Sequence, residues 1–162
     1  MYATQLDLPQ HMRDDASDLL QARLSDCLDL ETQFKQAHWT VRGIHFYELH
    51  KLFDALHHEV EEFVDVIAER ISAIGAVPDG RVQTTAKKTS LYPYALDTRG
   101  GAEHLRALAA SLSELGRLLR ADIDKAGEIG DADTADVFTE VSRGIDKQLW
   151  FVEAHLAGPG SD

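Results

Sequence analysis

Apolar residues recur every three or four positions along most of the chain, and polar residues fill the positions between them. The first such series occupies residues 20–37 and follows the candidate capping residues Asp14, Asp15 and Ser17. This spacing places apolar side chains on one face of a helix. The series therefore predicts an amphipathic helix that ends before Gly43.

Three further series have the same spacing, at residues 46–74, 105–123 and 138–156. Glycine and proline are common just after the end of a helix because they cannot continue it or because they adopt the conformation that closes it. They follow all three series, as Gly75 with Pro78, Gly130, and Gly158 with Pro159. The pattern thus predicts four amphipathic helices.

The connections between these helices predict how they are arranged. The links between the first and second and between the third and fourth are short, which favours antiparallel neighbours. Residues 76–100 form a longer polar connection, which we expect to carry a short helix of its own. The predicted fold is all-α, a ferritin-like four-helix bundle with one long crossover. We expect an N-terminal tail at 1–15, the bundle at 16–157 and a C-terminal tail at 158–162.

Length and composition agree with one domain in the cytoplasm. The chain has 162 residues, of which 44% are hydrophobic, enough for one buried core. Its apolar runs are shorter than a membrane span, and residues 1–16 lack the apolar stretch of a signal peptide. Cys27 is the only cysteine, which excludes an internal disulfide and fits a reducing compartment.

The chain carries a formal net charge of −12, which repels nucleic-acid phosphates. Lys87 and Lys88 are its only adjacent basic pair, Arg13 is the only basic residue in the N-terminal segment, and the C-terminal GPGSD has none. We therefore do not expect DNA binding through a basic tail. The negative charge would suit a protein that collects cations, although a solvated acidic surface has the same composition.

The second predicted helix carries an unusual polar stripe beside its apolar face. His50 and Asp54 are four residues apart, Asp65 and Glu69 repeat that spacing, and 11 residues separate the pairs, which keeps all four near one side of the helix. Imidazole and carboxylate ligands bind iron, manganese or zinc, and an oxygen-rich mixture with few nitrogens favours iron. Pairs at this spacing also occur as simple surface contacts.

The helical rise decides how these residues could share a metal. Asp54 and Asp65 should lie about 16 Å apart along a straight helix. That distance is too long for ligand bonds of about 2 Å. One helix therefore offers two half-sites, and an antiparallel second copy across a two-fold axis would complete two sites. A site inside one bundle would need Glu-x-x-His pairs, and the nearest match is one Asp-x-x-His, from Asp54 to His57.

The segments AHWTVRGIHFYELHKLFD and FVDVIAER resemble the Dps family of mini-ferritins, and the likeness extends over nearly the whole chain. The resemblance implies that one subunit contributes the ferroxidase ligands His38, His50 and Asp54. It further implies that the two-fold mate contributes Asp65 and Glu69. Trp39 matches a tryptophan beside the site, where it could equally be a hydrophobic wedge that ends the first helix.

The resemblance implies an enzyme that oxidises Fe(II), preferably with hydrogen peroxide rather than oxygen. It implies a hollow homododecamer, built from two-fold dimers, that stores Fe(III) mineral and protects the cell against oxidative damage. A nucleoid-protecting shell that binds DNA and uses its metal site secondarily is the alternative, with a nucleoid-associated location. Zinc or manganese in place of iron is a weaker alternative.

Two further groups of polar residues match features of the family. In the family, acidic residues near the position of Asp133, Asp136 and Glu140 line pores at three-fold axes, which implies the same role here. Acidic side chains are also favoured in the first turn of any helix. His58, Glu61 and Glu62 could continue an acidic inner face where mineral nucleates, or could form a solvated surface. The sequence assigns no role to three other histidines, His45, His57 and His104.

Overall fold

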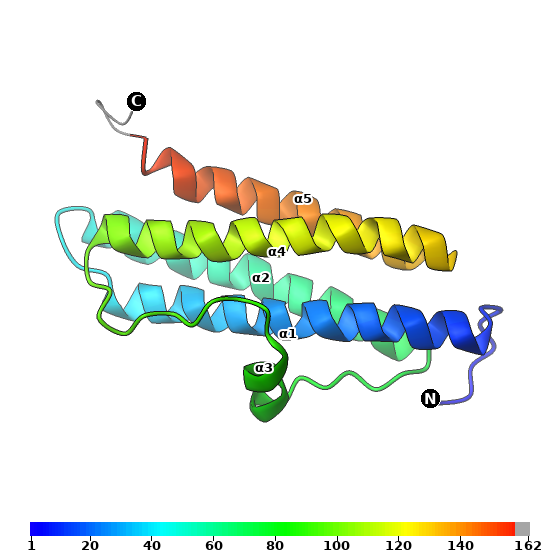
Figure 1. The fold of residues 1–162 in the computed structure, drawn as a ribbon. Coiled ribbons are helices and arrows are strands. Elements are labelled where there is room, and N and C mark those ends of the chain that lie inside the picture. Colours follow the sequence, from blue (N-terminus) through cyan, green and yellow to red (C-terminus); the bar gives the residue numbers. More distant parts are fainter. Residues whose placement is uncertain (158–162) are drawn as a thin grey trace.

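Four long helices lie side by side in the computed structural model, which describes residues 1–157 (Figure 1). A short fifth helix lies beside the bundle within the long crossover (Figure 1). The helices are α1 (Gln10–Thr40), α2 (Phe46–Ala73), α3 (Val82–Lys88), α4 (Gly101–Ile129) and α5 (Ala132–Ala154). In the bundle, α1 packs against α2 and α4, and α5 packs against α4 and α2. The predicted four-helix bundle, its long crossover and the short extra helix are confirmed.

The core consists of one apolar stripe from each long helix. Most residues of the predicted series are buried, and the exceptions lie toward helix ends or edges, as at Ile123, Leu149 and Leu156. A fully buried Leu or Phe side chain stabilises the fold by about 1.5–3 kcal/mol. The stripes therefore position the helices with no need for a ligand. None of the described helices combines the length and the apolar character needed to cross a membrane.

The first helix begins earlier than predicted, at Gln10. Pro9 occupies its N-cap with φ −54°, and its carbonyl accepts the first helical hydrogen bond from Arg13 at 3.2 Å. The expected capping residues near 14–17 therefore lie inside the helix, which includes part of the expected N-terminal tail. At the other end, α5 stops at Ala154, so Leu156 lies in the following turn. The expected C-terminal tail, 158–162, lies outside the described residues.

The N-terminal segment closes the end of α2. Gly75 has φ 86°, and the backbone N–H of Tyr2 donates to its carbonyl at 2.5 Å. A Cβ atom at Gly75 would lie 2.9 Å from the carbonyl oxygen of Tyr2, so glycine is required for both conformation and space. The Arg13 guanidinium donates to the carbonyl of Ile74 at 3.3 Å, which satisfies one acceptor left free at the helix end.

Side chains of α1 hold the crossover against the bundle. The Gln21 side-chain amide donates to the backbone carbonyl of Asp79 at 3.1 Å and accepts the backbone N–H of Asp79 at 2.8 Å. The buried Asp26 carboxylate accepts the backbone N–H of Ser90 at 2.6 Å, and the Gln33 amide donates to the carbonyl of Tyr92 at 3.2 Å. The long connection is therefore ordered along α1, where its backbone polar groups find partners.

Asp131 joins the start of α5 to α2. Its carboxylate accepts the backbone N–H of Thr134 at 3.1 Å and the Thr134 hydroxyl at 2.6 Å, which caps the helix. The Arg70 guanidinium of α2 donates to the same carboxylate at 2.6 Å. Burial raises the pKa of Asp131, but the hydrogen bonds from Thr134 and Arg70 outweigh it, and the pKa falls below its usual value.

Replacing Asp131 tests this connection. Asp131→Ala should lower the free energy of unfolding by about 2–4 kcal/mol, because it removes the cap and leaves Arg70 without its buried partner. Asp131→Asn keeps a capping oxygen but has no charge, so its free energy of unfolding should fall by less than that of Asp131→Ala. The carboxylate is stabilising above its unfolded pKa near 3.8, and this stabilisation is lost as pH falls through the lower folded pKa. Denaturation of both variants at neutral and acid pH measures the effect, and equal stability of parent and Asp131→Ala would contradict it.

Candidate metal centre

His38 and His50 meet where α1 ends and α2 begins. Gly43 lies in the turn between the two helices. Its φ angle is 116°, a backbone conformation that residues other than glycine rarely adopt. The two imidazole rings stack with centroids 3.7 Å apart and planes at 22°. The turn therefore brings together two histidines that are 12 residues apart in the sequence.

Each of these imidazoles bonds the backbone of the other residue. His38 Nδ1 lies 2.8 Å from the carbonyl oxygen of His50, and His50 Nδ1 lies 2.8 Å from that of His38. The His38 carbonyl is available because it lies in the last turn of α1, and the N–H of Arg42 donates to Arg99 instead. A carbonyl only accepts, so both Nδ1 atoms donate, and Nε2 is the nitrogen that carries the lone pair in the neutral form of each ring and can bind a metal.

Asp54 lies one turn beyond His50 and brings a carboxylate to the same place. Its Oδ1 atom lies 3.8 Å from His38 Nδ1 and 2.6 Å from the ammonium of Lys35 on α1. The hydrogen bond from Lys35 lowers the pKa of Asp54 below its usual value, so the carboxylate is ionised at neutral pH. Of the sequence-predicted residues, His38 therefore contacts both His50 and Asp54, but within one chain the ligand atoms of the three are not gathered around one point. Lys35 is a neighbour that sequence reasoning missed.

Asp65 and Glu69 lie elsewhere on α2. Both side chains are exposed, and neither makes a hydrogen bond or ion pair with another side chain among residues 1–157. Because α2 continues as one helix from Phe46 to Ala73, the rise between Asp54 and Asp65 is about 16 Å. A single chain thus presents His50 with Asp54 and Asp65 with Glu69 at separate positions along the helix.

Three exposed aromatic residues lie close to the histidine pair in the sequence, and one of them contacts His50. The Phe46 ring centroid lies 5.2 Å from that of His50, and Phe46 is 45% exposed. Trp39 is 66% exposed. Within the subunit it is therefore not a hydrophobic wedge that ends the first helix, which was one interpretation of the sequence. Tyr47 is also exposed. Several large apolar surfaces therefore lie uncovered next to the ligands.

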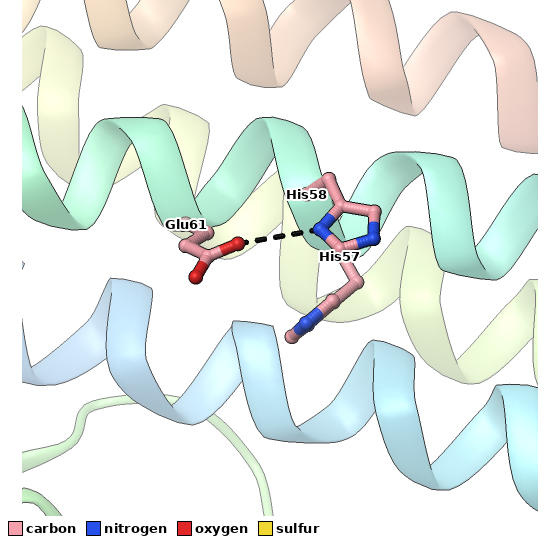
Figure 2. A group of neighbouring side chains, drawn as sticks. All are labelled: His57, His58 and Glu61. Atoms are coloured by element: carbon pink, nitrogen blue, oxygen red, sulfur yellow. Dashed lines mark hydrogen bonds and ion pairs between the residues drawn. The ribbon is translucent and has the colours of Figure 1, made fainter.

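A second group of possible ligands lies at the middle of α2. One ligand atom from each of His57, His58 and Glu61 can be chosen so that all lie within 4.8 Å of one another (Figure 2). The sequence had placed His58 and Glu61 with Glu62, which is exposed and outside this group. His57 was left unassigned, although a His-His pair followed one turn later by a glutamate was a visible signal.

The remaining candidates are separate from both groups. Asp133, Asp136 and Glu140 are exposed on the first turns of α5, where Asp133 also lies 3.7 Å from the Arg70 guanidinium. His104 is buried, shares a 2.6 Å hydrogen bond with the Tyr94 hydroxyl, and has its pKa lowered by burial. These features make His104 part of the core. His45 is exposed at the start of α2.

Comparisons of sequence find relatives over nearly the whole chain. The ferritin-like domain family matches residues 17–158. The DNA protection during starvation protein of Agrobacterium fabrum is 36% identical over 155 residues, which cover 96% of each protein. The DNA protection during starvation protein of Mycolicibacterium smegmatis is 31% identical over 90% of this chain and 79% of that protein.

Solved structures lead to the same family. Mycobacterium smegmatis Dps in its tetragonal form has a TM-score of 0.93 at 29% identity and covers 100% of this chain and 98% of that chain. Dps from Microbacterium arborescens in the high iron form has a TM-score of 0.87 at 33% identity and covers 94% of this chain and 99% of that chain. Sequence family, full-length relatives and fold coincide, and the chain belongs to the Dps family of ferritin-like proteins.

Proposed function

We propose that this protein is a ferroxidase and iron store, which oxidises Fe(II) with hydrogen peroxide in preference to oxygen. The observation that carries the proposal is the paired hydrogen bonding of His38 and His50. It makes Nε2 the nitrogen that each ring can offer to a metal, and the ionised carboxylate of Asp54 lies against the His38 ring, 3.8 Å from Nδ1. Relatives of this chain are named for DNA protection during starvation, and one related structure is a high iron form.

The complete site forms between two chains. An antiparallel copy of α2, paired across a two-fold axis near Glu59 and Val60, would bring Asp65 and Glu69 of the partner subunit to His50 and Asp54. The same pairing occurs twice, so a dimer holds two sites. The exposed aromatic side chains beside the histidines support an interface here, because large uncovered apolar surfaces mark places where proteins associate.

The ligand set suits iron as the substrate. Carboxylates favour Fe(III) over Fe(II), and a site with few nitrogen ligands leaves positions open for peroxide or water. In the proposed site Glu69 would bridge two irons, and His38 and His50 would hold the second ion. Two Fe(II) each give one electron to hydrogen peroxide, the O–O bond breaks, and two protons complete two water molecules. Because both electrons leave together, hydroxyl radical is not released.

Storage requires a shell and a path into it. We place six dimers in a hollow homododecamer in which Fe(III) mineral collects. Asp133, Asp136 and Glu140 line the three-fold pores, and their exposure on α5 is compatible with this role. Mineral nucleates on the acidic face that includes His58, Glu61 and Glu62. The net charge of −12 per chain draws Fe(II) toward the shell.

The protein protects DNA without holding it. The first nine residues, before α1, carry no Lys or Arg, and the chain as a whole repels phosphate. Removing Fe(II) and peroxide together suppresses the chemistry that damages DNA, so no direct contact is required. A DNA-binding shell would need cationic contacts that this sequence does not supply in its tails. We place the protein in the cytoplasm.

The carboxylates of the second half-site test the proposal. Asp65→Ala and Glu69→Ala should each slow the initial oxidation of Fe(II) by peroxide at least about tenfold, because each removes a direct ligand. Both side chains are exposed, so the fold should be unchanged. Glu48→Ala, an exposed carboxylate at the start of α2, is the control and should oxidise at the parental rate. Stopped-flow absorbance after anaerobic Fe(II) loading measures this, and parental rates in both variants would refute the ligand assignment.

Lys35 should compete with the metal for Asp54, because its ammonium already occupies Oδ1 at 2.6 Å. Lys35→Met should tighten Zn²⁺ binding at the site by up to about fivefold, the value of a partly exposed ion pair. The pKa of Asp54 would return toward its usual value but stay far below neutral. Lys51→Met removes the same charge from an exposed position and is the control. Calorimetry in both variants checks the difference, which is absent if Lys35 does not compete.

A further inference from the structure

His57, His58 and Glu61 lie together on the middle of α2, apart from the histidine pair at its start. His58 Nδ1 lies 3.2 Å from Glu61 Oε2, and the His57 and His58 ring centroids are 5.1 Å apart (Figure 2). The side chains of His58 and Glu61 are 64% and 61% exposed. Two imidazoles and one carboxylate thus lie within reach of one ion, and two of the three side chains are accessible to solvent.

His57 is held in a way that prepares it for a metal. Its side chain is only 12% exposed, and Nδ1 lies 3.2 Å from the backbone carbonyl oxygen of Glu31 on α1. Since a carbonyl only accepts, Nδ1 carries the hydrogen and Nε2 keeps the lone pair. Metal-binding histidines commonly donate their other N–H to a carbonyl or carboxylate, which fixes the ring for binding. A simple surface hydrogen bond between His58 and Glu61 would not need this arrangement.

We propose that His57, His58 and Glu61 bind one divalent first-row transition-metal ion, with water completing its coordination. Two imidazoles and a carboxylate are the protein ligands of many three-ligand zinc sites, and the same set accepts Fe(II) and Co²⁺. Mg²⁺ and Ca²⁺ prefer oxygen ligands and should not compete. The site needs one chain only, so it does not depend on dimer formation.

The position of this site along α2 gives it a role in iron handling, and this step alone rests on the proposed function. His58 lies one turn beyond Asp54, and Glu61 lies one turn before Asp65, on the same stripe of the helix. The rise from Asp54 to His58 is about 6 Å. In the antiparallel pair, the site lies between the two ferroxidase centres and holds Fe(II) close to both.

Zn²⁺ titration of the chelator-treated full chain, with excess Mg²⁺ present, tests the inference. His58→Gln and Glu61→Gln change exposed side chains, so the fold should persist. Each should remove one Zn²⁺ per chain from the binding isotherm or weaken that step at least tenfold. Glu48→Gln, which neutralises an exposed carboxylate of α2 outside this group, should bind as the parent does. Circular dichroism confirms the fold of each variant.

The outcomes separate this site from the proposed function. Unchanged Zn²⁺ binding in His58→Gln and Glu61→Gln overturns the inference, as does an equal loss in Glu48→Gln, which would indicate a diffuse acidic surface. A parent that binds this Zn²⁺ but does not oxidise Fe(II) supports the inference and refutes the ferroxidase. If the parent oxidises Fe(II) but Zn²⁺ binding is unchanged in both variants, the ferroxidase is supported and the inference is refuted.

Discussion

The two hydrogen bonds exchanged by His38 and His50 fix the geometry on which the candidate centre depends. They exist because α1 ends at Thr40 and leaves a carbonyl without a helical partner, and because the turn at Gly43 returns the chain beside it. The same bonds set the tautomer of both rings. A helix end, usually a place of unsatisfied groups, thus becomes the support for two ligands.

A second constraint, the rise of the helix, separates the ligands that one chain carries. Asp65 and Glu69 cannot approach His50 on a continuous α2, and α2 has no break between Phe46 and Ala73. The proposed dimer follows from this distance rather than from any surface feature alone. The stripe that runs from His50 to Glu69 also passes through His58 and Glu61, so an interface along it would bring all the candidate metal ligands of α2 into one line.

Much of the fold follows from periodicity, because apolar residues at threes and fours can be buried on one helix face only. The four helices of the bundle were predictable in this way, whereas the crossover and its short helix α3 were predictable from the length of the connection at residues 76–100. The start of α1 was not predictable in this way, because the acidic residues near 14–17 suit a helix cap as well as a helix interior. In the structure Pro9 is the N-cap, so α1 begins at Gln10. The tautomers of His38 and His50, the contact of Lys35 with Asp54 and the hold on His57 depend on packing between helices. Local sequence does not encode such contacts.

The central claim, that two chains build each site, is tested most directly by mixing complementary variants. One chain lacks His38, His50 and Asp54, the other lacks Asp65 and Glu69, and neither should oxidise Fe(II) rapidly alone. In a dimer of unlike chains, one site has all five ligands and the other has none. Reassembled mixed dimers should therefore recover up to half the parental sites, counted by Fe(II) binding and rapid oxidation. No recovery in dimers verified to contain both chains would show that the ligands belong to a single chain, and the account would be wrong.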